Sequence, residues 1–174
     1  MLFQYLPFSD PIAPLSRTEG TVLVVEDDSG DEFFILRALK SLNMEGRAVI
    51  ARDGEQATDF IFRTGSFANR SKVLDPRVIM LDLCLPKVAG LEVLRLVKEN
   101  KATRHIPVVV MTSSDSKTDV DRCYELGANS VFRKGTIIEE FRESLAVAIT
   151  YWTQVNVLRG QDSLEKETLA PTGK

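Results

Sequence analysis

Acidic side chains follow two strongly apolar stretches of this sequence. The run TVLVV (21–25) leads directly into the acidic triplet 26–28, and RVIML (77–81) leads into Asp82. Carboxylates held close together repel one another and lose part of their hydration, so such a cluster is unfavourable unless a cation joins it. Mg2+ suits the role because it takes oxygen ligands, keeps several waters and is held by a few carboxylates with phosphate oxygens. The pattern predicts a magnesium site.

Hydrogen-bond donors follow two further apolar runs. IPVVVM (106–111) precedes Thr112, and NSVF (129–132) is followed by Arg133 and Lys134. A hydroxyl and an ammonium group bind phosphoryl oxygens, and a dication would bring a phosphate-bearing donor to a site that otherwise repels anions. These residue types together favour a phosphoryl-transfer site in which the carboxylate of Asp82 is the nucleophile.

Each of these signals has an ordinary explanation when it is taken alone. An aspartate after a strand is most often a turn or helix-cap residue, and Thr112-Ser113 could cap the next helix. The acidic triplet could be a solvated cap, and Lys134 a surface lysine. The conjunction of compatible groups after four apolar runs is what favours the functional interpretation.

The apolar runs alternate with helical patterns along the chain. Because the central runs are apolar throughout, both faces of the sheet must be covered, as in a parallel sheet between helices. The sequence therefore predicts a doubly wound α/β fold with five parallel strands, whose carboxyl ends form one rim where ligands bind. The expected strands are 21–25, 47–51, 77–81, 106–111 and 129–132; the expected helices are 30–43, 54–65, one after Gly90, 116–126 and one from Ile137.

Composition narrows the class of protein. The 174 residues include 27% charged and 44% hydrophobic residues, as expected of one soluble globular domain. A net charge of −3 gives no reason to expect a nucleic-acid or acidic-membrane partner. The two cysteines argue against a disulfide framework or a zinc site, and neither a signal peptide nor a membrane-spanning stretch is evident, so we expect a cytoplasmic protein. We expect an N-terminal arm (1–19), the domain (20–158) and a disordered tail (159–174).

Four motifs resemble the CheY-like receiver domains of two-component response regulators, over roughly residues 20–152. They are VLVVEDD, VIMLDLCLPKVAGLEVL, IPVVVMTSS and VFRK. The resemblance implies the (βα)5 flavodoxin-like receiver fold and a cytoplasmic signalling protein that catalyses only its own phosphorylation and dephosphorylation. It implies a phosphoryl group received from a sensor histidine kinase, with Mg2+ as cofactor. The implied roles are phosphoacceptor for Asp82, switch hydroxyl for Thr112, phosphoryl-binding lysine for Lys134, and metal ligation by Glu26, Asp27, Asp82 and the backbone carbonyl of Cys84.

The spacing is most similar to a narrower group, the phytochrome-associated single-domain regulators. VEDDSGDEFFILRAL, DGEQATDFIFRTG and LPKVAGLEVLRLVK carry this resemblance, together with the long loop before the third strand. It implies a bacteriophytochrome as the narrower expectation for the kinase.

Two residues depart from the receiver pattern. Gly135 replaces the proline that usually follows the lysine, and Val131 replaces the aromatic residue three positions before it, while Phe132 would point to the opposite side of the strand. The alternative function is therefore a degenerate receiver that binds partners without phosphorylation.

Two other functions on this topology fit less well. A phosphatase of the haloacid-dehalogenase type needs a second aspartate where Cys84 stands, and a flavodoxin-like phosphate loop would be repelled by the acidic triplet 26–28.

The last helix carries two apolar lines. One can face the sheet, and the other has no evident cover within a monomer unless the N-terminal arm folds back over it. We therefore expect a homodimer through the last helix, with output by protein contact. The first line is Phe141, Leu145, Ala148, Trp152 and Val155; the second is Val147, Tyr151 and Leu158.

Overall fold

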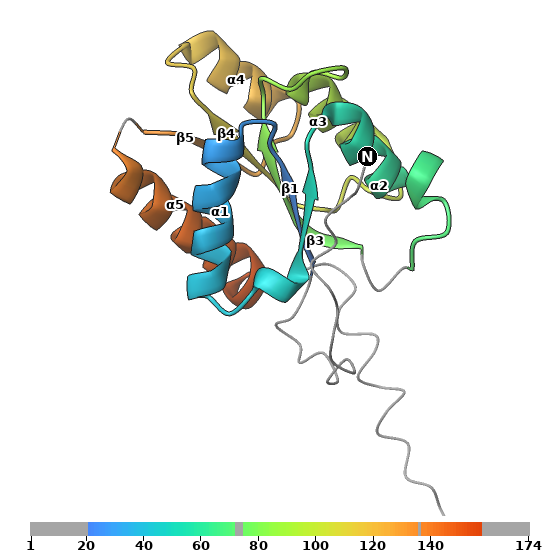
Figure 1. Ribbon diagram of the computed structural model, residues 1–174. Helices are drawn as coiled ribbons and strands as arrows, with labels where there is room; N and C mark the ends of the chain where they lie inside the picture. The colour runs from blue at the N-terminus through green and yellow to red at the C-terminus, as the bar shows by residue number, and fades with distance from the viewer. Residues whose placement is uncertain (1–20, 72–74, 136, 158–174) are drawn as a thin grey trace, which may run out of the picture.

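The structure is a computed structural model that describes residues 21–71, 75–135 and 137–157. Its five strands form a single parallel sheet in the order β2-β1-β3-β4-β5, which confirms the predicted doubly wound α/β fold (Figure 1). The strands are β1 (Thr21–Val25), β2 (Ala48–Ala51), β3 (Pro76–Asp82), β4 (Val108–Thr112) and β5 (Ser130–Arg133).

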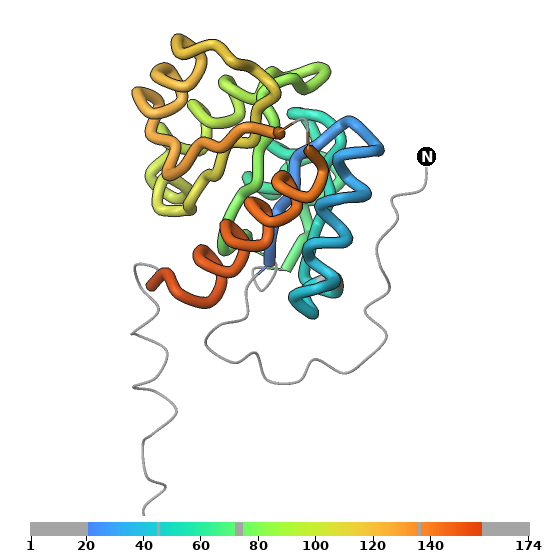
Figure 2. Tube along the Cα trace, turned by 90° about the vertical axis from the view of Figure 1, so that its left-hand side faces the viewer, coloured from blue at the N-terminus to red at the C-terminus, as the bar shows by residue number. Residues whose placement is uncertain are grey.

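Helices cover both faces of this sheet. The helices α1 and α5 lie side by side on one face (Figures 1 and 2), where they pack over one hydrophobic cluster, and α2, α3 and α4 pack over a second cluster on the other face. The helices are α1 (Ser29–Ser41), α2 (Gly54–Phe62), α3 (Gly90–Glu99), α4 (Lys117–Glu125) and α5 (Ile138–Thr150); short 3-10 helices span Glu45–Arg47 and Gly65–Phe67.

The central strands are buried along their whole length. Every residue of β1, β3 and β4 is buried, as the continuous apolar runs predict for strands covered on both faces. The bounds differ from expectation at β4, which begins at Val108 rather than at residue 106, since Pro107 has no N–H to donate to a neighbouring strand. Asp82 and Thr112 are themselves the last residues of β3 and β4, so the rigid sheet fixes both.

The end of the last helix differs from the predicted pattern. Phe141 and Leu145 are buried against the sheet as predicted, but Val155, which the periodicity places on the same line, is 62% exposed. The buried positions instead run at four-residue spacing through Ile149 to Thr153, which lies in the π-helix Tyr151–Val155 that follows α5.

Arg77 holds this π-helical end against the sheet. It lies in β3, is only 6% exposed, and its guanidinium donates to the carbonyl oxygens of Trp152 (3.3 Å) and Asn156 (2.9 Å). The guanidinium therefore supplies donors to carbonyls that a helix end leaves without intrahelical partners.

The predicted arm (1–19) and tail (159–174), like Leu158 of the second apolar line, lie outside the described residues. In the part of the chain that the structure describes, no helix combines the length and apolar character that a membrane crossing requires.

Candidate phosphoacceptor site

The strand register brings the predicted acidic residues to one edge of the sheet. Val25 lies beside Leu81 in the paired strands β1 and β3, so Glu26, which follows β1, lies at the same level as Asp82, the last residue of β3. Carboxylate oxygens of Glu26, Asp27 and Asp82 lie within 4.8 Å of one another. Glu26 and Asp82 are buried, whereas Asp27 is exposed. The predicted cluster of carboxylates is therefore present.

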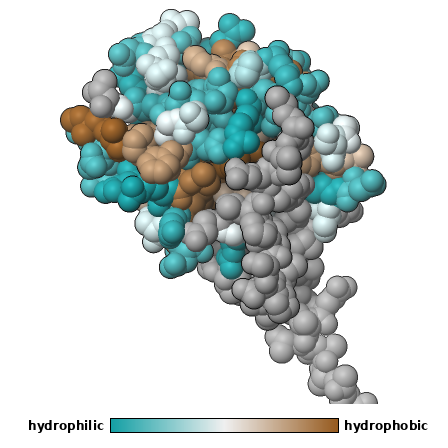
Figure 3. Space-filling model, viewed as in Figure 1, coloured by the Kyte–Doolittle hydropathy of each residue, from teal (hydrophilic) through white to brown (hydrophobic). Residues whose placement is uncertain are grey.

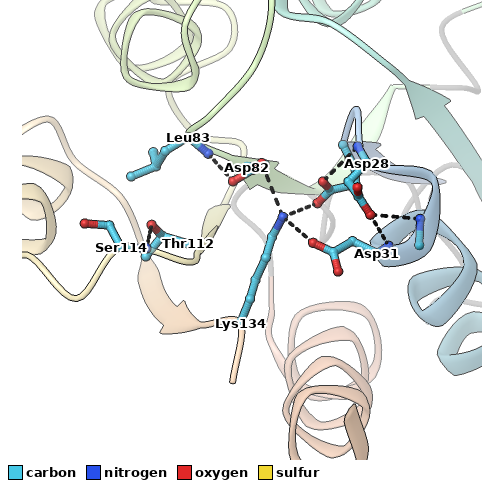
Figure 4. Close-up of polar contacts among 9 residues, drawn as sticks. Asp28, Asp31, Asp82, Leu83, Thr112, Ser114 and Lys134 are labelled. Carbon is cyan, nitrogen blue, oxygen red and sulfur yellow. Dashed lines mark hydrogen bonds and ion pairs between the residues drawn. The ribbon is translucent and has the colours of Figure 1, made fainter. Parts of the chain in front are cut away.

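Lys134 reaches into this cluster from the end of β5 (Figure 4). Its ammonium nitrogen lies 2.7 Å from Glu26 Oε2, 2.9 Å from Asp31 Oδ2 and 3.2 Å from Asp82 Oδ2, and its side chain is only 9% exposed. Burial alone would lower the pKa of Lys134, but hydrogen bonds to Asp31 and Glu26 and the charge of Asp82 outweigh it and hold that pKa above its ordinary value.

The cluster carries more negative than positive charge. Burial raises the pKa of Glu26 to about 7, in spite of the contact with Lys134 and with help from the charges of Asp82 and Asp31. One ammonium thus faces several carboxylates in partly desolvated surroundings. Oxygen ligands and an excess of negative charge are the features that a hard divalent cation requires, so the residues present fit Mg2+.

The two oxygens of Asp82 have different surroundings. Oδ1 accepts a hydrogen bond from the backbone N–H of Leu83 (2.7 Å), while Oδ2 faces Lys134. The loop after β3 is held close to Asp82 by Gly90 at the start of α3, where an added Cβ would lie 2.1 Å from the Asp82 carbonyl oxygen. Only glycine fits there, so the tight return of the chain depends on this residue.

Thr112 lies one step beyond the residue that pairs with Asp82, since Asp82 lies beside Met111 in the sheet. It is fully buried, and its hydroxyl oxygen accepts a hydrogen bond from the N–H of Ser114 (3.0 Å). The Ser114 hydroxyl in turn donates to Asp119 of α4 (2.6 Å). The predicted switch hydroxyl is therefore linked through one residue to the first turn of α4.

Asp28 and Cys84 lie near the cluster without contacting Lys134 in the described structure. The Asp28 side chain caps α1 by accepting from the N–H groups of Gly30 (2.8 Å) and Asp31 (2.9 Å), which is the ordinary role considered for the acidic triplet. Cys84 is exposed with a free thiol two residues after Asp82, and metal ligation by its carbonyl stays a prediction.

The sequence did not point to Asp31. An acidic residue in the first turn of a helix is normally explained by the helix dipole alone, and the contact with Lys134 joins residues 103 positions apart. The spacing of Asp31 after the capping residue gave no signal, because the contact depends on how α1 docks beside the end of β5.

Val131 in β5 occupies the position at which receivers usually carry an aromatic residue. Val131 packs into the cluster formed with α2, α3 and α4, and Phe132 packs on the opposite face, with its ring centroid 6.2 Å from that of Phe141. The predicted opposite orientation of Phe132 is thereby confirmed. An aromatic side chain from α4 reaches the same strand, since the Tyr124 hydroxyl accepts from the N–H of Val131 (3.3 Å).

Comparisons with known proteins agree with this geometry. Residues 22–146 match the family described as the response regulator receiver domain. The probable methanogenesis regulatory protein FilR2 of Methanothrix harundinacea is 38% identical over 131 residues, covering 75% of this chain and 82% of its own. Response regulator Rcp1 of Synechocystis is 33% identical over 143 residues, covering 82% of this chain and 95% of its own.

Solved structures show the same relationship in three dimensions. The Mn2+-bound form of Rcp1 superimposes with a TM-score of 0.75 at 32% identity, over 80% of this chain and 99% of that one. The phosphorylated cyanobacterial phytochrome response regulator RcpA gives a TM-score of 0.75 at 30% identity, over 81% and 99%. The fold, the cluster at the strand ends and these matches together show that the chain belongs to the response regulator receiver domain family.

Proposed function

We propose that this protein is a single-domain response regulator that accepts a phosphoryl group from a sensor histidine kinase onto Asp82. The observation that carries the proposal is the position of Asp82 Oδ2, 3.2 Å from the Lys134 ammonium and beside the carboxylates of Glu26 and Asp27. A nucleophilic carboxylate next to a buried cation is the arrangement that phosphoryl transfer requires, because charge on the transferred oxygens must be stabilised.

In the transfer step, a carboxylate oxygen of Asp82 forms a bond to phosphorus while the P–N bond to the kinase's phosphohistidine breaks. The departing imidazole keeps the electron pair of that bond and takes a proton from solvent. Lys134 and Thr112 would bind phosphoryl oxygens, and attack by water on the acyl phosphate would later release inorganic phosphate and restore Asp82. The protein would thus catalyse only its own phosphorylation and dephosphorylation.

Glu26, Asp27 and Asp82 would hold Mg2+, with the Cys84 carbonyl as a further oxygen ligand. When bound, the dication supplies charge neutralisation for the incoming phosphoryl oxygens. Rcp1, which this chain resembles in fold and sequence, has a structure described as Mn2+-bound, and this supports a divalent cation here.

The protein would act in the cytoplasm, and its partner would be a sensor histidine kinase. RcpA is a phytochrome response regulator by its description, and Rcp1 and RcpA both resemble this chain over about four-fifths of its length. These relatives support a bacteriophytochrome kinase as the finer proposal for the partner.

Output would pass through protein contact, including a homodimer formed by the last helix. Val147, Tyr151 and Val155 are 70%, 47% and 62% exposed at intervals of four residues, so the last helix presents a row of exposed apolar side chains. Apolar surface also gathers on the side of the molecule where α1 and α5 lie (Figure 3). Light scattering of the wild type beside Tyr151→Glu should show a dimer that the substitution dissociates; a monomeric wild type would end this part of the proposal.

Incubation with acetyl phosphate and Mg2+, followed by intact mass spectrometry, tests the central proposal. We expect the wild type to gain one phosphoryl group only when Mg2+ is present, and Asp82→Asn to gain none. Asp75→Asn is a matched control, because Asp75 precedes the same strand and pairs with Arg63 and Arg70 away from the site. A wild type without any adduct, and without Mg2+-dependent binding of beryllofluoride, would instead favour the degenerate receiver that acts as an interaction module.

A further inference from the structure

Among the residues that the structure describes, Asp31 is the one contact of the Lys134 ammonium that neither the carboxylate cluster nor the phosphoacceptor role explains. It lies in the first turn of α1, its oxygen is 2.9 Å from the Lys134 nitrogen, and its side chain is 31% exposed. In the described part of the chain, the carboxylates that lie close enough together to share a cation are Glu26, Asp27 and Asp82, and Asp31 is not among them. Its carboxylate is therefore available to Lys134 even when the other acids are engaged.

The backbone holds Asp31 in this position. Asp28 caps α1, and its carboxylate accepts from the Asp31 N–H at 2.9 Å, which fixes the residue at the helix start. A negative charge in a first helical turn is also favoured by the helix dipole. Asp31 is consequently a carboxylate on a rigid element, aimed across the site at the end of β5 (Figure 4).

The Lys134 ammonium makes two hydrogen bonds and one longer ion pair. A lysine ammonium has three N–H donors. Two of them make hydrogen bonds to Glu26 (2.7 Å) and Asp31 (2.9 Å), whereas Asp82 is paired at the longer distance of 3.2 Å. The two hydrogen bonds hold the ammonium at ion-pair distance from the oxygen of Asp82 to which a phosphoryl group would be attached.

We infer that Asp31 is a positioning residue that orients the Lys134 ammonium toward the phosphoryl group on Asp82. The inference rests on the proposed function and deepens it. A dication held by Glu26, Asp27 and Asp82 would repel the lysine and draw Glu26 away from it, and Asp31 would then be the anion that keeps the ammonium beside Asp82.

The first test measures Mg2+-dependent binding of beryllofluoride, a stable substitute for the phosphoryl group, by the full chain. Asp31→Ala should bind it roughly tenfold more weakly than the wild type, because a hydrogen bond to a charged group is lost. Asp31→Asn, which keeps an acceptor oxygen but loses the charge, should fall between the two. Glu32→Gln is the matched control, since Glu32 is the adjacent acid and pairs with Arg52 instead.

The second test needs neither Mg2+ nor a phosphoryl analogue. Protons of a hydrogen-bonded, buried lysine ammonium exchange slowly enough with water to be detected by NMR, and the signal missing from Lys134→Arg identifies Lys134. We expect this signal to shift or broaden in Asp31→Ala while the backbone spectrum of β1 and β3 stays unchanged. A purely structural role for Asp31 would alter the backbone spectrum or the unfolding midpoint without singling out this signal.

The outcomes separate the two proposals. If the wild type binds beryllofluoride and Asp31→Ala binds it equally well or more tightly, the inference is wrong while the proposed function stands. If the wild type binds none, the proposed function fails and the inference fails with it. An unchanged Lys134 signal in Asp31→Ala also overturns the inference, whatever the wild type binds.

Discussion

Two lysines place their ammonium groups at opposite ends of the sheet, and the hydrogen-bond partners of the two groups differ in charge. Lys134 follows β5 at the carboxyl ends of the strands and contacts carboxylates of Glu26, Asp31 and Asp82. Lys98, at the end of α3, donates to the carbonyl oxygen of Ile106 and the amide oxygen of Asn129, both at 2.8 Å and both just before β4 and β5.

The charge of the partners decides whether the pKa of each lysine lies below or above its ordinary value. Burial lowers the pKa of Lys98 to about 8, because neutral acceptors do not compensate for the lost hydration of the ammonium. Carboxylates hold the pKa of Lys134 above its ordinary value in spite of burial. Lys98 therefore acts as a tie between loops at the amino ends of the strands, whereas Lys134 is an electrostatic part of an acidic site. The same residue type serves two ends of one sheet in different ways.

The largest effect is expected for Lys134→Met. Removing the ammonium leaves Glu26, Asp31 and Asp82 without their counter-charge, so the free energy of unfolding should fall by about 3–5 kcal/mol at pH 8 in the absence of Mg2+. Urea denaturation measures this loss. Addition of Mg2+ should restore more stability to the variant than to the wild type, and an equal response of both proteins would contradict the clustered charge.

Lys98→Met should have a smaller effect that Mg2+ does not change. The substitution removes a costly buried charge but leaves the Ile106 carbonyl without the donor seen here, so we expect a loss of about 1–2 kcal/mol. Urea denaturation with and without Mg2+ is again the measurement. A loss as large as that of Lys134→Met, or one that Mg2+ reverses, would show that the two lysines do not differ as described.

Asp82→Asn should stabilise the metal-free protein. It relieves repulsion within the carboxylate cluster while Glu26 and Asp31 still pair with Lys134, and we expect a gain of about 1 kcal/mol. Thermal unfolding without Mg2+ should therefore show a higher melting temperature than that of the wild type. A lower one would mean that the pairing of Asp82 with Lys134 outweighs the repulsion among the acids.

A further expected effect concerns the pH dependence of stability. In the unfolded chain Lys98 titrates near 10.5, and in the folded protein near 8, so between these values the unfolded state binds more protons. The contribution of Lys98 to stability therefore rises as the pH rises from about 8 to about 10.5.

Asn129→Asp tests this contribution by giving Lys98 a carboxylate partner like those of Lys134. The new charge should raise the folded pKa of Lys98 and flatten its part of the pH dependence, which urea unfolding at pH 8, 9 and 10 can follow relative to the wild type. The exposed Asn43 provides the control substitution Asn43→Asp. Parallel pH curves for wild type and Asn129→Asp would contradict the assignment to Lys98.

The sequence alone determined the sheet and most of the site. Uninterrupted apolar runs predict strands covered on both faces, and parallel strands bring their carboxyl ends to one edge. The order of residues along the chain is therefore enough to place four groups of the site together: Glu26, Asp82, Thr112 and Lys134. The observed strand bounds differ from the predicted ones by one or two residues, as at the later start of β4. These differences leave all four groups at the carboxyl ends of the strands.

Only the tertiary structure decided which partners these groups have. Lys134 donates a hydrogen bond to Asp31 because α1 lies close to the end of β5. No pattern in the local sequence predicts this contact between distant elements. Val155 is exposed, and the π-helical end of the last helix is held by Arg77, a distant strand residue. Periodicity predicts the face of a regular element, whereas contacts between elements depend on packing geometry that the periodicity does not contain.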